Sequence, residues 1–311
     1  MGMLDPGESL DVQALGDLMK NYEMSEAGKT LMPGLPVVAR LDGKNFSNFT
    51  RGLDKPFDAR FVEAMDEVCK DLMAEFHPAV IYTQSDEITM AWNPVDPESN
   101  EEMIFGGRVQ KLVSLLAGRA SSKFSLEMVA RLPEKARSGA VPSMDCRVWQ
   151  FPSPRLAAAC FMWREADASK NSVSMLAGSH FSHKQLDGVS SKMRKEMLFQ
   201  KGIDWAALEP RLKRGSFFFR RRVETQLDAA TLAKIPEAKR PASGRVERSM
   251  ILREDLPPLS SLFNRTEVLF GGAAPVTIGA AILSGAMPAP LAHEREAGNA
   301  LERGSKPRLK S

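Results

Sequence analysis

The chain has 311 residues, 43% of them hydrophobic, which allows about two domains and a sizeable core. Lys and Arg number 42 against 39 Asp and Glu, and this net charge of +3 neither requires nor excludes a nucleic-acid partner. The three cysteines form no Cys-x-x-Cys pair, which argues against a cysteine-rich zinc site and favours a reduced, intracellular protein. The N-terminus lacks the features of a signal peptide and no apolar run is long enough to span a membrane, so a soluble, cytoplasmic protein is expected.

The first half of the chain predicts strands and helices in alternation. Apolar residues recur every three or four positions from Phe61 to Phe76, which is typical of an amphipathic helix. The tight link Gln84–Asp86 predicts a hairpin. In chain order, the expected elements are a helix over Leu10–Tyr22, a strand over Val37–Asp42, a helix over Asp58–Phe76, strands over Ala79–Thr83 and Glu87–Trp92, a helix over Glu101–Phe124 and a strand over Cys146–Phe151.

From the first predicted strand onward, the order is strand, helix, strand, strand, helix, strand, which is the ferredoxin-like βαββαβ plan of an α+β protein. This plan makes the first and third strands central. The end of the first strand and the turn of the hairpin then fall on one edge of the sheet. Asp42 and Asp86 are therefore expected to approach each other although 44 residues separate them, as in a polymerase-type palm.

The second half predicts further helices and two strands after a boundary at Pro152–Pro154. These elements are helices over Arg155–Arg164, Ala168–Phe181 and Ser190–Lys201 and strands over Ser216–Arg220 and Arg245–Leu252. Residues 273–311 are rich in Ala, Gly and Pro, lack aromatic residues and are expected to be disordered. The predicted division is a palm-like catalytic domain over 1–152 with an N-terminal extension over 1–34, a C-terminal region over 153–272 that completes the site and binds RNA, and a tail over 273–311.

The acidic residues at the predicted sheet edge suggest a metal site. Asp42 alone could form an Asx turn, and acidic residues such as Asp86 are common in hairpins. Together, however, two carboxylates suit Mg²⁺, which also accepts carbonyl, water and phosphate oxygens. Gly43 lacks a side chain, so its backbone can lie against a phosphate or offer its carbonyl to a metal.

Two basic segments have both a functional and a structural interpretation. Arg108, Lys111 and Ser114 share one helix face, where they could hold a triphosphate or form an ordinary solvated stripe. Several arginines also surround Phe217–Phe219. This second segment fits a phosphate-backbone patch, and it equally fits a core strand with charged residues at both ends.

Four ordered motifs resemble the tRNA-His guanylyltransferase superfamily, the 3′-to-5′ polymerases. They are Arg40-Leu-Asp42-Gly43-Lys-Asn-Phe46, Gln84-Ser85-Asp86-Glu87, Arg108-x-x-Lys111-x-x-Ser114 and Asp145-Cys-Arg147-Val. The resemblance runs from about residue 35 to about residue 270 and includes Leu256-Pro-Pro-Leu259 and Asn264-Arg265-x-Glu267-Val268.

The resemblance implies an RNA nucleotidyltransferase with two Mg²⁺ ions and with ATP or GTP as substrates. Asp42, Asp86 and Glu87 would form the catalytic group, with the metals on Asp42, Asp86 and the Gly43 carbonyl. The nucleotide would be bound by Asp42, Gly43, Lys44, Asn45, Phe46, Ser47, Ser85, Asp86, Arg108, Lys111 and Ser114. The RNA would contact Asp167, Asn171, Lys192, Lys213 and Arg214.

One departure from the family concerns a His-Ile-Asn-Asn signature of the eukaryotic enzymes. The matching segment here is Asp167-Ala-Ser169-Lys170-Asn171-Ser172, which keeps the aspartate and one asparagine but lacks the histidine. This is similar to the bacterial and phage guanylyltransferase-like branch, and it implies template-dependent repair of 5′-truncated tRNA. The alternatives are obligatory addition of the extra 5′ G to tRNA-His, a nucleotide cyclase or 5′-to-3′ polymerase, and a non-catalytic RNA-binding protein. The family also implies a homotetramer, and the lack of a long apolar run predicts no membrane partner.

Overall fold

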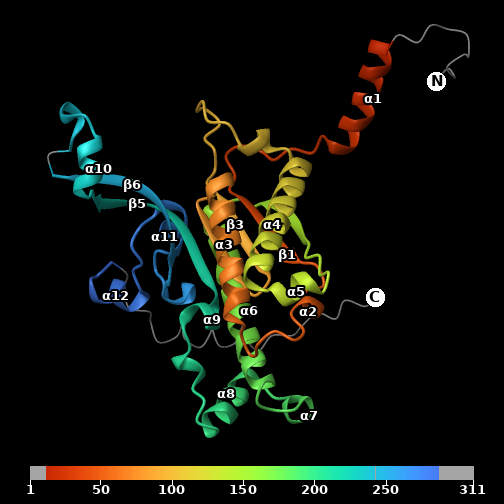
Figure 1. Cartoon of the computed structure of the whole chain (residues 1–311), viewed down its shortest axis with the longest axis vertical. Helices are drawn as coiled ribbons and strands as arrows, with labels where there is room; N and C mark the ends of the chain where they lie inside the picture. The colour runs from red at the N-terminus through yellow and green to blue at the C-terminus, as the bar shows by residue number, and fades with distance from the viewer. Residues whose placement is uncertain (1–11, 242, 287–311) are drawn as a thin grey trace, which may run out of the picture.

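The computed structural model of the chain describes residues 12–241 and 243–286. Its centre is a six-stranded sheet with the strand order β4-β1-β3-β2-β5-β6, in which all neighbours are antiparallel (Figure 1). The strands are β1 (Val37–Gly43), β2 (Val80–Gln84), β3 (Glu87–Trp92), β4 (Met144–Gln150), β5 (Ser216–Gln226) and β6 (Arg245–Glu254). Helices pack on this antiparallel sheet, so the predicted α+β class is confirmed.

The first four strands follow the predicted order of elements. Helix α3 (Ala59–Phe76) connects β1 to β2, and α4 (Val109–Arg131) connects β3 to β4. Strands β1 and β3 are the inner pair of these four, as predicted. Helix α4 begins later than expected, because Gly106 and Gly107 adopt positive φ angles of 61° and 69° and form part of a separate 3₁₀ turn.

The main core lies between the sheet and helices α3 and α4. Alternate residues of β1, including Ala39 and Leu41, are fully buried against these helices. Helix α3 begins at Ala59 because the Asp58 carboxylate accepts a hydrogen bond from the Arg60 backbone N–H at 3.0 Å. The hydrogen bond from the Arg60 side chain lowers the pKa of Asp58 to about 2.

The opposite face of the sheet is covered by α6 (Pro154–Gly178), which buries Ala157, Phe161 and Ala168 against it. The prediction of two helices over this segment is wrong. One helix is possible because the polar side chains near its middle have partners: Arg164 pairs with Asp167 at 3.3 Å, and buried Glu165 pairs with Arg214 at 2.7 Å.

Short helices follow α6 and lead into the last two strands. They are α7 (His183–Leu186), α8 (Ser191–Gln200) and α9 (Pro210–Arg214), with α8 corresponding to the predicted helix. Strands β5 and β6 extend the sheet beyond β2, so the sheet continues across the predicted boundary at residue 152. The buried Phe217–Phe219 segment of β5 supports the core-strand interpretation of that sequence.

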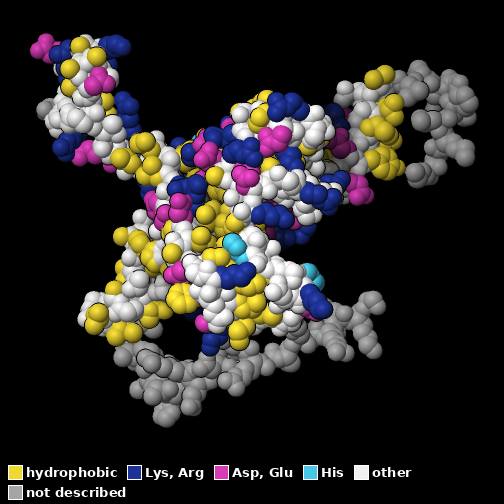
Figure 2. All heavy atoms as spheres, turned by 60° about the horizontal axis from the view of Figure 1, so that its bottom comes forward, with side chains coloured by type: hydrophobic (Ala, Val, Ile, Leu, Met, Phe, Trp, Pro, Cys, Tyr) yellow, Lys and Arg dark blue, Asp and Glu magenta, His cyan; other side chains and the backbone are white. Residues whose placement is uncertain are grey.

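Two parts of the molecule project from this body. Helix α1 (Val12–Ala27) extends away from the sheet (Figure 1) and contains no buried residue. Its exposed apolar side chains form a stripe (Figure 2). The outer parts of β5 and β6 form a ribbon with α10 (Ala229–Lys234) near its tip (Figure 1). None of the helices in the described part of the chain is long and apolar enough to cross a membrane.

The C-terminal segment differs in part from the expected disorder. Residues 273–286 contain α12 (Ile278–Leu283), and the Val276 carbonyl accepts a hydrogen bond from Phe263 N at 2.8 Å. The rest of the predicted tail, 287–311, lies outside the described residues. The remaining helices are α2 (Phe46–Phe49), α5 (Pro133–Arg137) and α11 (Arg265–Gly271), with 3₁₀ turns at Ile104–Gly107, Trp205–Ala207, Glu237–Lys239 and Leu259–Ser261.

Candidate active site

The end of β1 and the β2–β3 turn lie at one edge of the sheet. The last β1–β3 pair is Leu41 with Ile88, so Asp42 and Asp86 come at the same end of their strands. A Cβ added to Gly43 would lie 2.8 Å from Asp86 Oδ2, which means that this carboxylate packs directly against the Gly43 backbone. The two acidic segments therefore approach each other as the sequence predicts, and we call this place the acidic edge.

The electrostatics of Asp86 favour a cation at the acidic edge. Burial raises the pKa of Asp86, and the neighbouring Asp42 carboxylate raises it further. The Ser85 hydroxyl opposes this shift by donating a hydrogen bond to Asp86 Oδ1 at 3.0 Å. Within the described ranges, no group of three or more His, Cys, Asp or Glu side chains could hold a metal ion. A metal here would thus need two carboxylates together with backbone, water or phosphate oxygens, a ligand set that suits Mg²⁺.

Glu87 lies next to Asp86 in the chain but its carboxylate is already paired. Arg164 on α6 binds both of its oxygens, with Nη2 2.6 Å from Oε2. Burial raises the pKa of Glu87, while the Arg164 guanidinium lowers it. Arg164 also lies 3.3 Å from Asp167, so Glu87 and Asp167 are held by the same cation. This geometry gives Glu87 a positioning contact with α6.

A carboxylate that sequence reasoning did not place in the site lies beside Asp42. The β1–β4 register pairs Asp42 with Asp145, and directly opposite residues of neighbouring strands point to the same face. The Asp145 side chain is 54% exposed and lies 3.8 Å from Arg147, so it remains accessible to a ligand. The motif that contains Asp145 was visible in the sequence, but its position opposite Asp42 depends on the register.

A cavity of about 350 Å³ opens next to the acidic edge. Its walls come from the loop 50–58, the N-terminal half of α3, the end of β2, the end of α6, and α9. Ser85 lines the cavity and is hydrogen-bonded to Asp86, which connects the two features. The volume lies within the range of small-molecule sites. Residues of this cavity that the sequence analysis did not select include Lys55, Phe57, Asp66 and Arg211.

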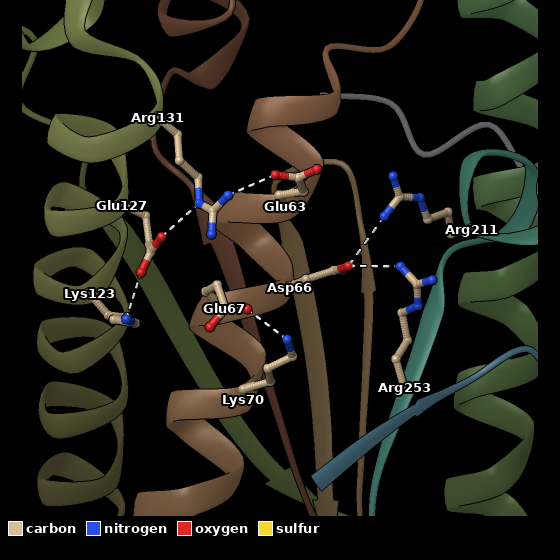
Figure 3. A network of polar contacts seen from close by, with 9 residues as sticks. All are labelled: Glu63, Asp66, Glu67, Lys70, Lys123, Glu127, Arg131, Arg211 and Arg253. Atoms are coloured by element: carbon tan, nitrogen blue, oxygen red, sulfur yellow. Dashed lines mark hydrogen bonds and ion pairs between the residues drawn. The ribbon is translucent and has the colours of Figure 1, made fainter.

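One wall of the cavity carries a buried ion-pair network. Asp66 on α3 points toward Arg211 and Arg253, away from the network that joins Glu63 to Arg131 and Glu127 on α4 (Figure 3). Burial raises the pKa of Asp66, and the hydrogen bond from Arg253 opposes this effect. The sequence signal for Asp66 was a charged residue on the apolar face of a predicted helix.

The residues after Gly43 lie in two environments: some are exposed beside the site, and one is buried in the core. Lys44 donates its backbone N–H to Ser143 O at 2.8 Å, and its side chain is exposed. Asn45 has a left-handed backbone with φ of 60°, and Ser47 is exposed on α2. Phe46, in contrast, is 3% exposed and packs 5.3 Å from the Phe124 ring. Its side chain therefore belongs to the core, and only its backbone is left for a nucleotide contact.

Arg108, Lys111 and Ser114, which are predicted to bind a nucleotide, lie away from the acidic edge within one chain. Contact of Phe124 with Phe46 places the C-terminal half of α4 near the acidic edge. Arg108 lies at the other end of this 23-residue helix, which is about 35 Å long, and forms a bridge with Thr30 before β1 begins. All three side chains are exposed, so they form a surface separate from the acidic edge.

The predicted RNA-binding residues lie on α6, α8 and α9, and some are engaged in the fold. Arg214 pairs with Glu165 at 2.7 Å and donates to Leu256 O at 3.0 Å. Lys213 donates to Ala206 O at 2.6 Å. Asn171 and Lys192 are exposed. Arg214 thus has a structural contact that the sequence did not indicate, while Asn171 and Lys192 are accessible to a partner.

Two carboxylates where neighbouring strands end, beside a cavity of about 350 Å³, are typical of enzymes that transfer nucleotides with bound metal ions. A family model described as tRNAHis guanylyltransferase matches residues 16–152. The bacterial tRNA(His) guanylyltransferase (Thg1)-like protein in complex with ATP is 35% identical, with a TM-score of 0.61, and the match covers 66% of this chain and 88% of that one. The chain belongs to the tRNAHis guanylyltransferase family of nucleotidyltransferases.

Other relatives extend this comparison. The structure of the bacterial protein in complex with GTP is 28% identical, with a TM-score of 0.61 over 80% of this chain and 94% of that one. The tRNA(His) guanylyltransferase of Debaryomyces hansenii is 29% identical over 61% of this chain and 75% of that protein. An uncharacterized protein, R259, of Acanthamoeba polyphaga mimivirus is 37% identical over 118 residues, 36% of this chain and 40% of the viral protein, so this chain spans less than half of that relative.

Proposed function

We propose that the protein adds nucleotides in the 3′-to-5′ direction to the 5′ end of tRNA. The observation that carries this proposal is the Asp86 carboxylate, which is packed on the Gly43 backbone, faces the charge of Asp42 and opens onto the cavity through Ser85. The family to which the chain belongs supports the RNA substrate. On this proposal the β1-α3-β2-β3-α4-β4 unit is a ferredoxin-like palm of the polymerase type.

The residues at the acidic edge fit two Mg²⁺ ions. The raised pKa of Asp86 reflects an ionised form that is unfavourable until a cation compensates it. Asp42, Asp86 and the Gly43 carbonyl would hold the ions. When bound, such ions would increase the nucleophilicity of a hydroxyl and neutralise a leaving pyrophosphate. Glu87 would act indirectly, because Arg164 occupies both of its oxygens.

The incoming nucleoside triphosphate would occupy the cavity, with its phosphates directed toward Asp86. Ser85, which lines the cavity and contacts Asp86, marks the junction between base and phosphates. Lys44 has an exposed side chain beside the acidic edge and would contact the phosphates. The two bacterial structures that contain ATP and GTP support a purine nucleotide.

The more specific reaction that we propose is template-dependent repair of 5′-truncated tRNA. The segment from Asp167 to Ser172 on α6 lacks the histidine of the eukaryotic signature, and Asn171 is exposed there. Asp167 is close to Arg164 and through it to Glu87, so this face of α6 leads directly to the acidic edge. A tetramer and a cytoplasmic location remain predictions.

The test is nucleotide addition to labelled tRNAs with each nucleoside triphosphate and Mg²⁺. We expect addition to a 5′-truncated tRNA only of the nucleotide that pairs with the opposite strand, and no addition after Asp42→Asn or Asp86→Asn. Asp96→Asn, an exposed aspartate in the loop after β3, is the matched control and should retain activity. Untemplated addition of one G to full-length tRNA-His would indicate the guanylyltransferase reaction instead. Full activity of Asp42→Asn or Asp86→Asn would refute the two-metal site.

A further inference from the structure

The inner wall of the cavity contains a hydrogen-bond acceptor without a donor. Asp66 is 7% exposed, and its Oδ2 atom lies 3.0 Å from Arg253 Nη1 and 3.7 Å from Arg211 Nη1 (Figure 3). Its other oxygen, Oδ1, is buried and has no hydrogen-bond partner among the described residues. Asp66 lines the cavity. Leaving a buried carboxylate oxygen without a hydrogen-bond donor costs free energy. We therefore expect a bound ligand to donate a hydrogen bond to Oδ1.

A hydrogen-bond donor lies in the same wall. Arg211 lines the cavity from α9, and its Nε atom is buried without a hydrogen bond in the described structure. Glu209 Oε2 lies 3.1 Å from this Nε in an ion pair that lacks hydrogen-bond geometry. The wall therefore contains one carboxylate oxygen and one guanidinium nitrogen that lack hydrogen-bond partners in the described structure, on residues of two different elements whose side chains approach to 3.7 Å.

The remaining walls suit a flat ring. Phe57, Val62 and Met175 contribute apolar side chains to the cavity, and Ser85 marks its connection with Asp86. A purine base carries an exocyclic amino group near a ring nitrogen that accepts hydrogen bonds. This arrangement of donor and acceptor is the complement of Asp66 and Arg211.

We propose that Asp66 and Arg211 recognise the purine base of the nucleoside triphosphate. Asp66 Oδ1 accepts a hydrogen bond from the exocyclic amino group, and Arg211 Nε donates to a ring nitrogen. This inference rests on the proposed function, because it assumes that the cavity binds the nucleotide. It makes these two residues determinants of nucleotide choice, with no contact to the reacting atoms.

The experiment measures nucleotide affinity by calorimetry with Mg²⁺ and without RNA. The ligands are two pairs that differ in the amino group: ATP with purine riboside triphosphate, and GTP with inosine triphosphate. For the unaltered protein we expect the amino-bearing member of each pair to bind about tenfold or more tightly, since hydrogen bonds to charged groups are among the stronger ones. In Asp66→Asn the amide oxygen should stay with Arg253, so the amide NH₂ replaces Oδ1. The preference for the nucleotide that carries the amino group should then disappear. ATP and GTP should bind more weakly, while the affinities for purine riboside triphosphate and inosine triphosphate should stay the same.

Two further variants separate recognition from stability. Asp71→Asn is the matched control, because Asp71 is on the same helix, pairs with Arg119 and does not line the cavity. It should leave all four affinities unchanged. Arg211→Lys keeps the positive charge near Asp66 but removes the Nε donor, so it should weaken all four ligands, which share the ring nitrogens, and preserve the amino preference.

The outcomes also distinguish this inference from the proposed function. An unchanged amino preference in Asp66→Asn would overturn it and leave Asp66 as a structural ion pair between α3, β6 and α9. If Asp66→Asn does not fold, Arg211→Lys decides: unaltered affinity for all four nucleotides would overturn the proposal. If the unaltered protein binds none of the nucleotides, both this inference and the nucleotide site fail.

Discussion

At the scale of single residues, Asp86 is destabilised by the environment that suits it to metal binding. Burial and the Asp42 charge raise its pKa, so the folded protein holds this proton to a higher pH than the unfolded chain does. Stability is therefore lost as pH rises from the ordinary carboxyl pKa of 3.8 through the raised value, and the full penalty is present at neutral pH. A bound cation would offset this penalty.

The corresponding prediction is that Asp86→Asn gains stability while it loses activity. At pH 7 we expect the free energy of unfolding to increase by about 0.5–2 kcal/mol, the usual range for a stabilising single substitution. The gain should shrink as pH falls toward 4. Thermal unfolding with and without Mg²⁺ provides the measurement: Mg²⁺ should stabilise the unaltered protein and have little effect on Asp86→Asn. Asp96→Asn should behave like the unaltered protein, and a lower stability of Asp86→Asn at neutral pH would contradict this account.

The sequence predicted the residues of the site that depend on strand ends, and it missed those that depend on register or packing. Asp42 and Asp86 could be found because each terminates a recognisable apolar run. Asp145 could not be placed opposite Asp42 without the β1–β4 register. Asp66 and Arg211 meet only because α9 packs beside α3, and no local pattern encodes that contact.

At the scale of elements, α6 connects the predicted RNA-binding region to the sheet. Glu165 near the middle of this helix is 4% exposed, and it binds Arg214 before β5 and Leu259 N after β6. Burial raises the pKa of Glu165, whereas these two contacts lower it. The ion pair explains why α6 continues through a segment for which the sequence predicted a break, since the polar residues there are satisfied by later parts of the chain.

From this geometry we expect Arg214→Met to act mainly on stability. Removing one partner of a buried ion pair leaves Glu165 unpaired, which typically costs about 3–5 kcal/mol. The loss should be smaller at pH 5 than at pH 8, because protonation of Glu165 relieves the uncompensated charge. Chemical denaturation at both pH values measures this. Lys192→Met, at an exposed position predicted to bind RNA, is the comparison and should stay within about 0.5 kcal/mol of the unaltered protein. Equal stability of both variants would show that the Glu165–Arg214 pair contributes little.

Helix bounds were predicted less well than strand order for a local reason. Gly106 and Gly107 have positive φ angles and terminate a separate 3₁₀ turn before α4 starts. The spacing of apolar residues in the sequence does not reveal this break. Strand order, in contrast, follows from the alternation of apolar runs over the first half of the chain. The helices after residue 200 have five to seven residues and were missed, because so few residues carry too little periodic signal. The longer strands β5 and β6 were predicted in part.

At the scale of the whole molecule, the two predicted phosphate-binding groups lie at opposite ends of the sheet. Asp42 and Asp86 are at the acidic edge, and Arg108 and Lys111 are at the start of α4 beside Thr30. A single chain cannot bring both groups to one triphosphate. If Arg108 and Lys111 are required for nucleotide addition, a second copy of the chain must supply them, in agreement with the predicted oligomer.

This arrangement predicts that two inactive variants restore each other when mixed. Asp86→Asn supplies intact Arg108 and Lys111, and the double variant Arg108→Ala, Lys111→Ala supplies an intact acidic edge. After joint unfolding and refolding in equal amounts, half of symmetric dimers contain both chains, and one of their two shared sites is intact, so activity should return to about a quarter of the unaltered level. Each variant alone should be inactive, and a mixture of Asp42→Asn with Asp86→Asn should stay inactive because both lesions lie at the same edge. No recovery in the first mixture would mean that each chain completes its site alone, and full activity of the Arg108, Lys111 variant would remove these residues from the reaction.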